Sequence, residues 1–120
     1  MEAVMEQLPQ TGAIQFTIQV SAQQNYSARA AQRIVRRFVA DEISYLLRVG
    51  EPTLVIGEQI CWRVPVVLAL PNAGPIGTVG SISVDVETGQ LLVTPEEILE
   101  IGRHARDLAA HFPTPASPTP

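Results

Sequence analysis

The sequence predicts an α+β fold, with two helices packed against one antiparallel sheet in the order β-α-β-β-β-β-α. Two segments have helical periodicity, and several shorter stretches alternate between apolar and polar residues as half-buried strands do. Strand, helix, a run of strands and a final helix is an order typical of α+β domains. A length of 120 residues and a hydrophobic content of 46% suit one globular core.

The first strand is expected over residues 14–20, where isoleucine, phenylalanine and valine alternate with glutamine and threonine. A long helix should follow over residues 28–49, with Ser27 as its N-cap. Gly50 stands where a left-handed residue would end this helix, and Pro52 follows shortly after.

Three or four strands are expected between the two helices. They cover residues 53–56, 60–70, 79–86 and 91–93, separated by glycine-rich or proline-rich turns. Pro65 lies inside the longest of these stretches and cannot donate a backbone hydrogen bond to a neighbour. The strand over 60–70 should therefore lie at a sheet edge or be bulged at this residue.

The second helix is expected over residues 95–112. Thr94 and Glu97 form a capping box, with Thr94 as N-cap and Pro95 at the first helical position. A glutamate at the third helical position can reach back to the backbone of the cap. These signals fix where the helix begins.

Residues 12–112 are predicted to form a single domain. Residues 1–11 read as a flexible lead-in, and the Pro-, Thr- and Ser-rich residues 113–120 as a disordered tail. No apolar run approaches the ~18 residues that span a bilayer. The N-terminus lacks the basic-then-apolar order of a secretion signal, so a cytoplasmic protein without membrane contact is expected.

Composition excludes several kinds of chemistry. All eight basic residues are arginine, so neither a lysine Schiff base nor a P-loop can form. Cys61 is the single cysteine, which excludes an internal disulfide framework and a multi-cysteine zinc site. A net charge of −4 argues against a general nucleic-acid binder. No cofactor is implied.

The apolar side of the first predicted helix spans roughly 200° of arc, more than one sheet contact needs. The second helix, a loop or a second copy of the chain must cover the surplus. Glu42 falls near the centre of this arc, where an isolated charge is costly. It is therefore a candidate buried acid, or a structural carboxylate that pairs with Arg63 or extends to solvent at the helix flank. The apolar arc comprises Ile34, Val35, Phe38, Val39, Ile43, Leu46, Leu47 and Val49.

The opposite side of the same helix has a basic stripe of four residues, Arg29, Arg33, Arg36 and Arg37. Positive charge early in a helix opposes the helix dipole, so helix stability does not explain this order. The stripe suits phosphate or an acidic protein surface, because guanidinium groups hold both with paired hydrogen bonds. A solvated face that keeps the helix soluble is the alternative interpretation.

Glu100, His104, Asp107 and His111 share one side of the second predicted helix. Each i,i+4 pair among them could hold a metal loosely, but the two histidines are ~10 Å apart. A solvent-facing row of side-chain pairs is the alternative, and no metal site is assigned. Cys61 lies in an apolar strand with no evident base nearby, so no catalytic constellation emerges and no enzyme is predicted.

Residues 62–66 (Trp-Arg-Val-Pro-Val) and 83–91 (Ser-Val-Asp-Val-Glu-Thr-Gly-Gln-Leu) resemble the PepSY-type small α/β module. The shared pattern is a helix, a strand with an aromatic residue, and a hairpin that closes on an Asp-x-x-Thr-Gly turn. It covers roughly half of the chain. Such domains are generally non-enzymatic, so the resemblance implies a role in binding or restraining another protein. The family is usually exported or membrane-tethered, and its pattern has neither the first strand nor the last helix expected here.

The predicted function is a non-catalytic protein-interaction module, of which an inhibitor or antitoxin-like partner is one form. The alternative is a small dimeric regulator that binds nucleic acid or an anionic ligand through the arginine stripe. A homodimer is expected through the helix face over 28–49 or the strand edge over 60–70. If residues 14–20 and 95–112 cover these surfaces instead, the chain is a monomer.

Overall fold

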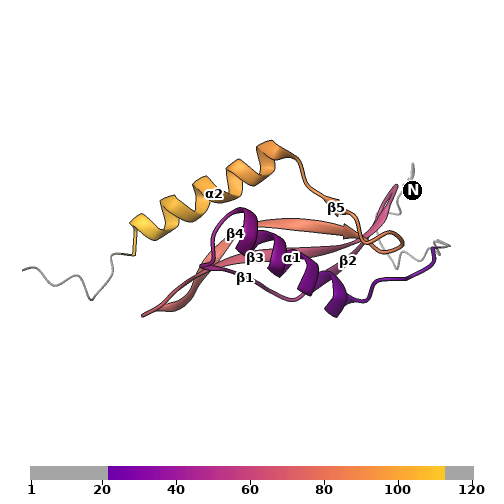
Figure 1. Cartoon of the computed structure of the whole chain (residues 1–120), viewed down its shortest axis with the longest axis horizontal. Coiled ribbons are helices and arrows are strands. Elements are labelled where there is room, and N and C mark those ends of the chain that lie inside the picture. The colour runs from indigo at the N-terminus through magenta and orange to yellow at the C-terminus, as the bar shows by residue number, and fades with distance from the viewer. Residues whose placement is uncertain (1–21, 113–120) are drawn as a thin grey trace, which may run out of the picture.

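The computed structural model describes residues 22–112 (Figure 1). Over these residues the protein has the predicted α+β fold, an antiparallel sheet with two helices. The strand expected over 14–20, the lead-in 1–11 and the tail 113–120 lie outside the described residues. The elements are α1 (Ala28–Glu42), β1 (Leu47–Val49), β2 (Thr53–Ile56), β3 (Ile60–Leu70), β4 (Gly74–Asp85), β5 (Leu91–Leu92) and α2 (Pro95–Ala110).

A long antiparallel hairpin of β3 and β4 forms the centre of the sheet (Figure 1). Both β1 and β2 pair with the other side of β3, one after the other along its length. β5 pairs with the end of β4 through Leu91 and Leu92. All of these pairings are antiparallel, as expected for strands joined by short connections.

The expectation that β3 forms a sheet edge is wrong, because β3 has strands on both sides. β3 is not bulged at Pro65 either, because Pro65 pairs with Ser81, and the register shift between Val66 and Val67 leaves the extra residue, Val79, in β4. The carbonyl oxygen of Pro65 accepts a hydrogen bond from the Gly50 amide at 2.9 Å. In an antiparallel strand the carbonyl oxygen and the amide nitrogen of one residue point to the same side. The nitrogen of Pro65, which has no hydrogen to donate, therefore faces the gap between β1 and β2, where Gly50 lies. An interior strand tolerates proline there because its neighbour is interrupted.

The first helix is shorter than the predicted 28–49, because it ends at Glu42. The Ser44 side-chain oxygen accepts from the Leu46 amide, and its carbonyl oxygen from the Leu47 amide, both at 3.1 Å. These local bonds compete with helix continuation and turn the chain. Leu47 then opens β1, where only 1% of its surface is exposed. The apolar residues at the end of the predicted helix thus belong to a turn and a strand.

The other elements agree with the sequence except at their ends. β4 begins at Gly74 rather than at residue 79, although residues 74–80 are rich in glycine and proline. Their pairing with the second half of β3 overrides this low strand propensity. α2 begins at Pro95 with the predicted capping box and ends at Ala110.

Both helices pack on the same face of the sheet. Val66 and Gly80 are cross-strand partners and therefore share this face. A Cβ atom at Gly80 would lie 2.7 Å from Cγ1 of Ile101 in α2, so the glycine allows close approach of this helix. The core between the helices and the sheet contains Ala31, Val35, Val39, Leu47, Val64, Val66, Leu68, Val79, Ile82, Val84, Ile101 and Ala105.

Candidate binding groove along α1

The local structure of α1 directs its arginines to solvent. Ser27 is the N-cap, as predicted, and its side-chain oxygen accepts from the Ala30 amide at 3.1 Å. Val35 and Val39 are fully buried against the sheet. The arginines lie on the outer side of the helix, where all four are exposed.

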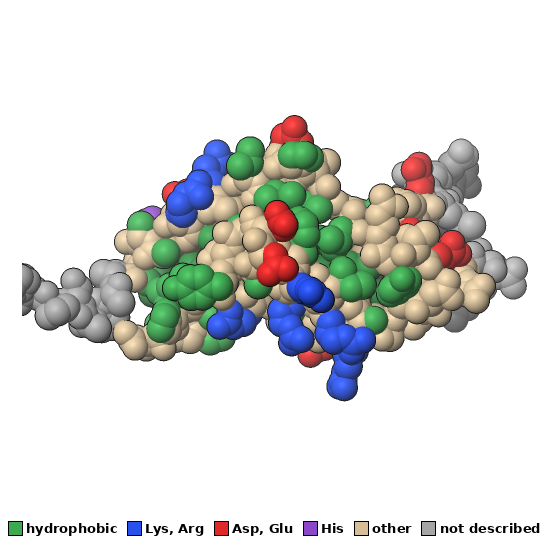
Figure 2. Space-filling model, in the orientation of Figure 1, with side chains coloured by type: hydrophobic (Ala, Val, Ile, Leu, Met, Phe, Trp, Pro, Cys, Tyr) green, Lys and Arg blue, Asp and Glu red, His purple; other side chains and the backbone are tan. Residues whose placement is uncertain are grey.

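An open groove follows the outer side of α1 and has a volume of about 470 Å³. In Figure 2, basic side chains gather along this part of the surface. The groove brings together three of the four predicted arginines with three less polar residues. Its lining consists of Tyr26, Ala30, Arg33, Ile34, Arg36 and Arg37.

Tyr26 enters the groove from the segment before the helix and was not among the predicted binding residues. Its amide and that of Asn25 both donate to the carbonyl oxygen of Val86, at 3.0 and 2.9 Å. The indole nitrogen of Trp62 donates to the carbonyl oxygen of Tyr26 at 2.8 Å. The ring lies over Gly89, where no Cβ atom would fit. Helical spacing does not predict this position, because Tyr26 precedes the helix and is held by Trp62 and Val86, which lie far from it in the sequence.

The turn beneath Tyr26 is the Asp-x-x-Thr-Gly segment. One carboxylate oxygen of Asp85 accepts from the amides of Glu87 and Thr88, at 2.8 and 3.0 Å. These bonds lower the pKa of Asp85 below its ordinary value, and the bond from the Thr88 amide has the larger effect. Gly89 has φ +73° and donates its amide to the Asp85 carbonyl oxygen. The turn is therefore held by four residues and gives Tyr26 a fixed support.

Most of the arginine charge on α1 is not balanced by nearby carboxylates. Arg37 lies 3.9 Å from Asp41, in an exposed pair. Across residues 22–112, no carboxylate lies within ion-pair distance of Arg29, Arg33 or Arg36. The positive end of the helix dipole adds to this charge. The outer side of α1 is therefore an uncompensated basic surface that favours an anionic partner.

The interpretation of Glu42 as a buried acid is wrong, and the alternative, a carboxylate that extends to solvent, is confirmed, because Glu42 is exposed. It is the last residue of α1. Leu46, beside which the carboxylate would have been buried, lies in the following turn and not in the helix. The structure shows no ion pair between Glu42 and Arg63 among the residues described.

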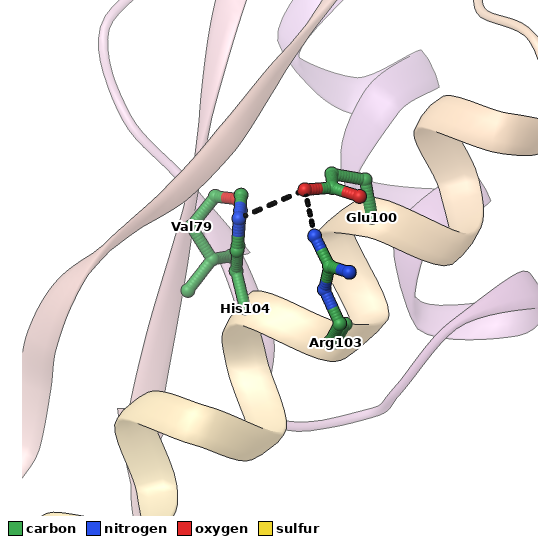
Figure 3. Close-up of polar contacts among 4 residues, drawn as sticks. All are labelled: Val79, Glu100, Arg103 and His104. Carbon is green, nitrogen blue, oxygen red and sulfur yellow. Dashed lines mark hydrogen bonds and ion pairs between the residues drawn. The ribbon is translucent and has the colours of Figure 1, made fainter.

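Three of the four candidate metal ligands on α2, Glu100, His104 and His111, contact other groups of the protein through their side chains, and Figure 3 shows the first two. Glu100 lies between Arg103, with which it pairs, and His104, whose Nε2 is 3.2 Å from a Glu100 carboxylate oxygen. The other ring nitrogen of His104 lies 3.2 Å from the Val79 carbonyl oxygen. His111 contacts the backbone carbonyl of Asp107 at 2.8 Å. The part of the chain that the structure describes has no cluster of three or more potential metal ligands.

Cys61 is buried, with 9% of its surface exposed, and lies opposite Asp85 in the sheet. Strand alternation places it on the other face from Val64 and hence away from both helices. His104 and His111 lie on α2, so neither approaches the thiol from the helix side. The structure therefore does not bring a cysteine and a histidine together.

Comparisons with protein-family models, curated proteins and solved structures found no match to this chain. The PepSY resemblance stays a prediction based on residues 62–66 and 83–91. Neither helix between residues 22 and 112 is long and apolar enough to cross a membrane.

Proposed function

We propose that this protein is a non-catalytic, cytoplasmic protein-interaction module that binds its partner along α1. An inhibitor or antitoxin-like partner is one form of this role. The observation that favours it most is the groove in which Arg33, Arg36 and Arg37 lie beside Tyr26. Arginine and tyrosine are enriched among the residues that dominate protein interfaces.

The placement of the reactive side chains supports a role without catalysis. The Asp85 carboxylate accepts hydrogen bonds from the backbone amides of its own turn. His104 is engaged by Glu100 and by the backbone of Val79. Cys61 is buried on the face of the sheet away from α2, and both histidines belong to α2 or its C-cap. A nucleophile needs a base within hydrogen-bond reach, and the arrangement supplies none to this thiol from α2.

A second candidate function rests on the same basic surface. A dimer with two copies of the arginine stripe could bind nucleic acid or another extended anion. The uncompensated charge of Arg29, Arg33 and Arg36 favours this candidate. Its binding should weaken steeply with added salt, because arginine contacts to phosphates release counterions.

We also propose a homodimer. Because β3 has strands on both sides, the proposed dimer interface is the outer edge of β2. Leu54 and Ile56 of this strand are 44% and 54% exposed. Exposed edges with apolar side chains favour pairing with another strand. Light scattering at micromolar concentration tests it, because a mass near 13.0 kDa would leave a monomer. A mass near twice that value, reduced by Leu54→Lys, is expected for the dimer.

The test of the interaction role compares two double variants of equal charge change. Arg33→Gln with Arg36→Gln removes two charges from α1, and Arg103→Gln with Arg106→Gln removes two from α2. Each variant has a net charge of −6, from −4 minus 2. Proteins captured from the native host are identified, purified and measured against all three forms by calorimetry. We expect a purified partner that binds the wild type and the α2 variant but not the α1 variant. A partner that binds all three forms equally would contradict the proposal.

A further inference from the structure

We infer that the groove along α1 binds an extended acidic segment of the partner protein, anchored by one apolar side chain. The carboxylates of the segment pair with Arg33, Arg36 and Arg37, and its apolar side chain packs on Tyr26 and Ile34. The inference rests on the proposed function, because it gives the chemistry of the partner at the same groove.

The spacing of the arginines fits alternate positions of an extended chain. Arg33 and Arg37 are one helical turn apart, which corresponds to about 6 Å along the axis. Residues i and i+2 of an extended segment are about 6.6 Å apart and point to the same side. Carboxylates at alternate positions therefore meet Arg33 and Arg37 in register, with Arg36 beside them. Each guanidinium can hold a carboxylate through two parallel hydrogen bonds.

The floor of the groove is apolar and comes from two segments. Ala30 and Ile34 are half-buried residues of α1, and Tyr26 comes from the segment before it. The backbone of Tyr26 is held by Trp62 and Val86, and its ring packs on Gly89, so this part of the floor is supported by the fold itself. Binding to a preformed surface avoids part of the entropy cost of association. A free phosphate would leave this floor uncovered, whereas an aliphatic or aromatic side chain would cover it.

Length and charge favour a protein segment over nucleic acid. From Ala28, the first helical residue, to Arg37 the helical rise is about 13.5 Å, the span of about four extended residues. Asp41 and Glu42 are exposed at the end of α1, where they would repel a polyanion that continued along the helix. The net charge of −4 opposes binding of a long polyanion elsewhere. A short acidic stretch that ends before Asp41 avoids both penalties.

Fluorescence anisotropy on the full chain tests the inference with a labelled ten-residue peptide. Asp alternates with Ser in this peptide, and Leu replaces one central Asp, so that Leu points to the same side as the carboxylates; the control peptide has Ser in place of this Leu. We expect the wild type to bind it, and the peptide without Leu to bind about three- to tenfold more weakly, because less apolar surface is buried. Arg33→Gln with Arg36→Gln should weaken binding by about tenfold or more. Arg103→Gln with Arg106→Gln should stay within about twofold, because a distant rim charge contributes little.

Circular dichroism and thermal unfolding first establish that both double variants are folded, so that a loss of binding reports on the groove. Equal peptide affinity of the wild type and the α1 variant would overturn the inference. Tighter binding of a ten-nucleotide single-stranded DNA than of the peptide would assign the groove to nucleic acid instead. A doubled mass in the wild type but not in the α1 variant would assign it to a second copy. If a purified partner needs Arg33 and Arg36 but no acidic peptide binds, this inference fails and the proposed function stands.

Discussion

The two helices lie on the same face of one sheet but differ in how their outer surfaces use charge. On α2, Glu100 is paired with Arg103 and His104 (Figure 3). On α1, Arg33 and Arg36 have no carboxylate partner among the described residues and lie beside a fixed tyrosine. Charges that neighbours on the same helix already satisfy are typical of a solvated surface. The comparison therefore separates an ordinary exposed helix from a candidate binding surface.

The largest loss of stability is expected at Gly89, on which the ring of Tyr26 packs. Gly89→Ala should lower the free energy of unfolding by about 2–4 kcal/mol, from a left-handed backbone and from overpacking against Tyr26. Gly74→Ala is the matched control, because Gly74 also has positive φ (+69°) but no atom near its Cβ position. It should cost only about 1–2 kcal/mol. Denaturant unfolding measures both variants, and equal losses would mean that Tyr26 does not pack on the turn as described.

The next effect concerns the carboxylate that orders the same turn. Asp85→Asn should cost about 1–3 kcal/mol at neutral pH, because amide bonds to a charged acceptor are lost. The pKa of Asp85 is lowered in the folded protein, so its contribution is present above the ordinary value near 4. It is lost as the pH falls through the lowered value. The stability difference between wild type and variant should therefore shrink as urea unfolding is repeated from pH 5 to pH 2. A constant difference over this range would contradict the assigned role.

Smaller losses of stability, similar for the two helices, are expected at their N-caps. Ser27→Ala and Thr94→Ala should each cost about 1 kcal/mol, because each removes an acceptor for a helix amide. Thr94 also belongs to a capping box in which Glu97 accepts from its backbone amide. Glu97→Gln should therefore change stability less than Thr94→Ala. Thermal unfolding of the three variants checks this order, and a larger loss from Glu97→Gln would contradict it.

The sequence was sufficient for features set by nearby residues. The capping box at Thr94, the cap at Ser27 and the strands around Gly57 follow from local chemistry and periodicity. The end of α1 was not predictable in this way. Leu46, Leu47 and Val49 fit a helical face by spacing, but pairing of β1 with β3 and the turn bonds of Ser44 decide their structure. Such pairing depends on residues far away in the sequence.

The candidate site was predicted in the same partial way. The arginine stripe follows from helical spacing, and the structure keeps its side chains outward. Tyr26 was missed because its place depends on bonds to Trp62 and Val86, which lie far from it in the sequence. The error over Glu42 has the same origin as the error in helix length, since its predicted surroundings assumed a helix that continued to residue 49. Pro65 predicted a sheet edge from a local rule, that proline cannot donate a backbone hydrogen bond to a neighbouring strand. The structure meets this rule inside the sheet, because the neighbouring strand is interrupted between β1 and β2.

The smallest effect distinguishes the two helices directly through single neutralisations. Arg103→Gln removes an exposed i,i+3 pair with Glu100 and should cost about 0.2–0.5 kcal/mol. Arg36→Gln removes a charge without a described partner from the middle of α1, where the helix dipole has little effect, so it should change stability by no more than about 0.2 kcal/mol. Urea unfolding at low and high salt measures both, and salt should reduce both differences because it screens exposed charges. A loss of stability from Arg36→Gln as large as that from Arg103→Gln would mean that Arg36 stabilises the fold. Helix stability would then explain the basic stripe, and the stripe would no longer indicate a binding groove.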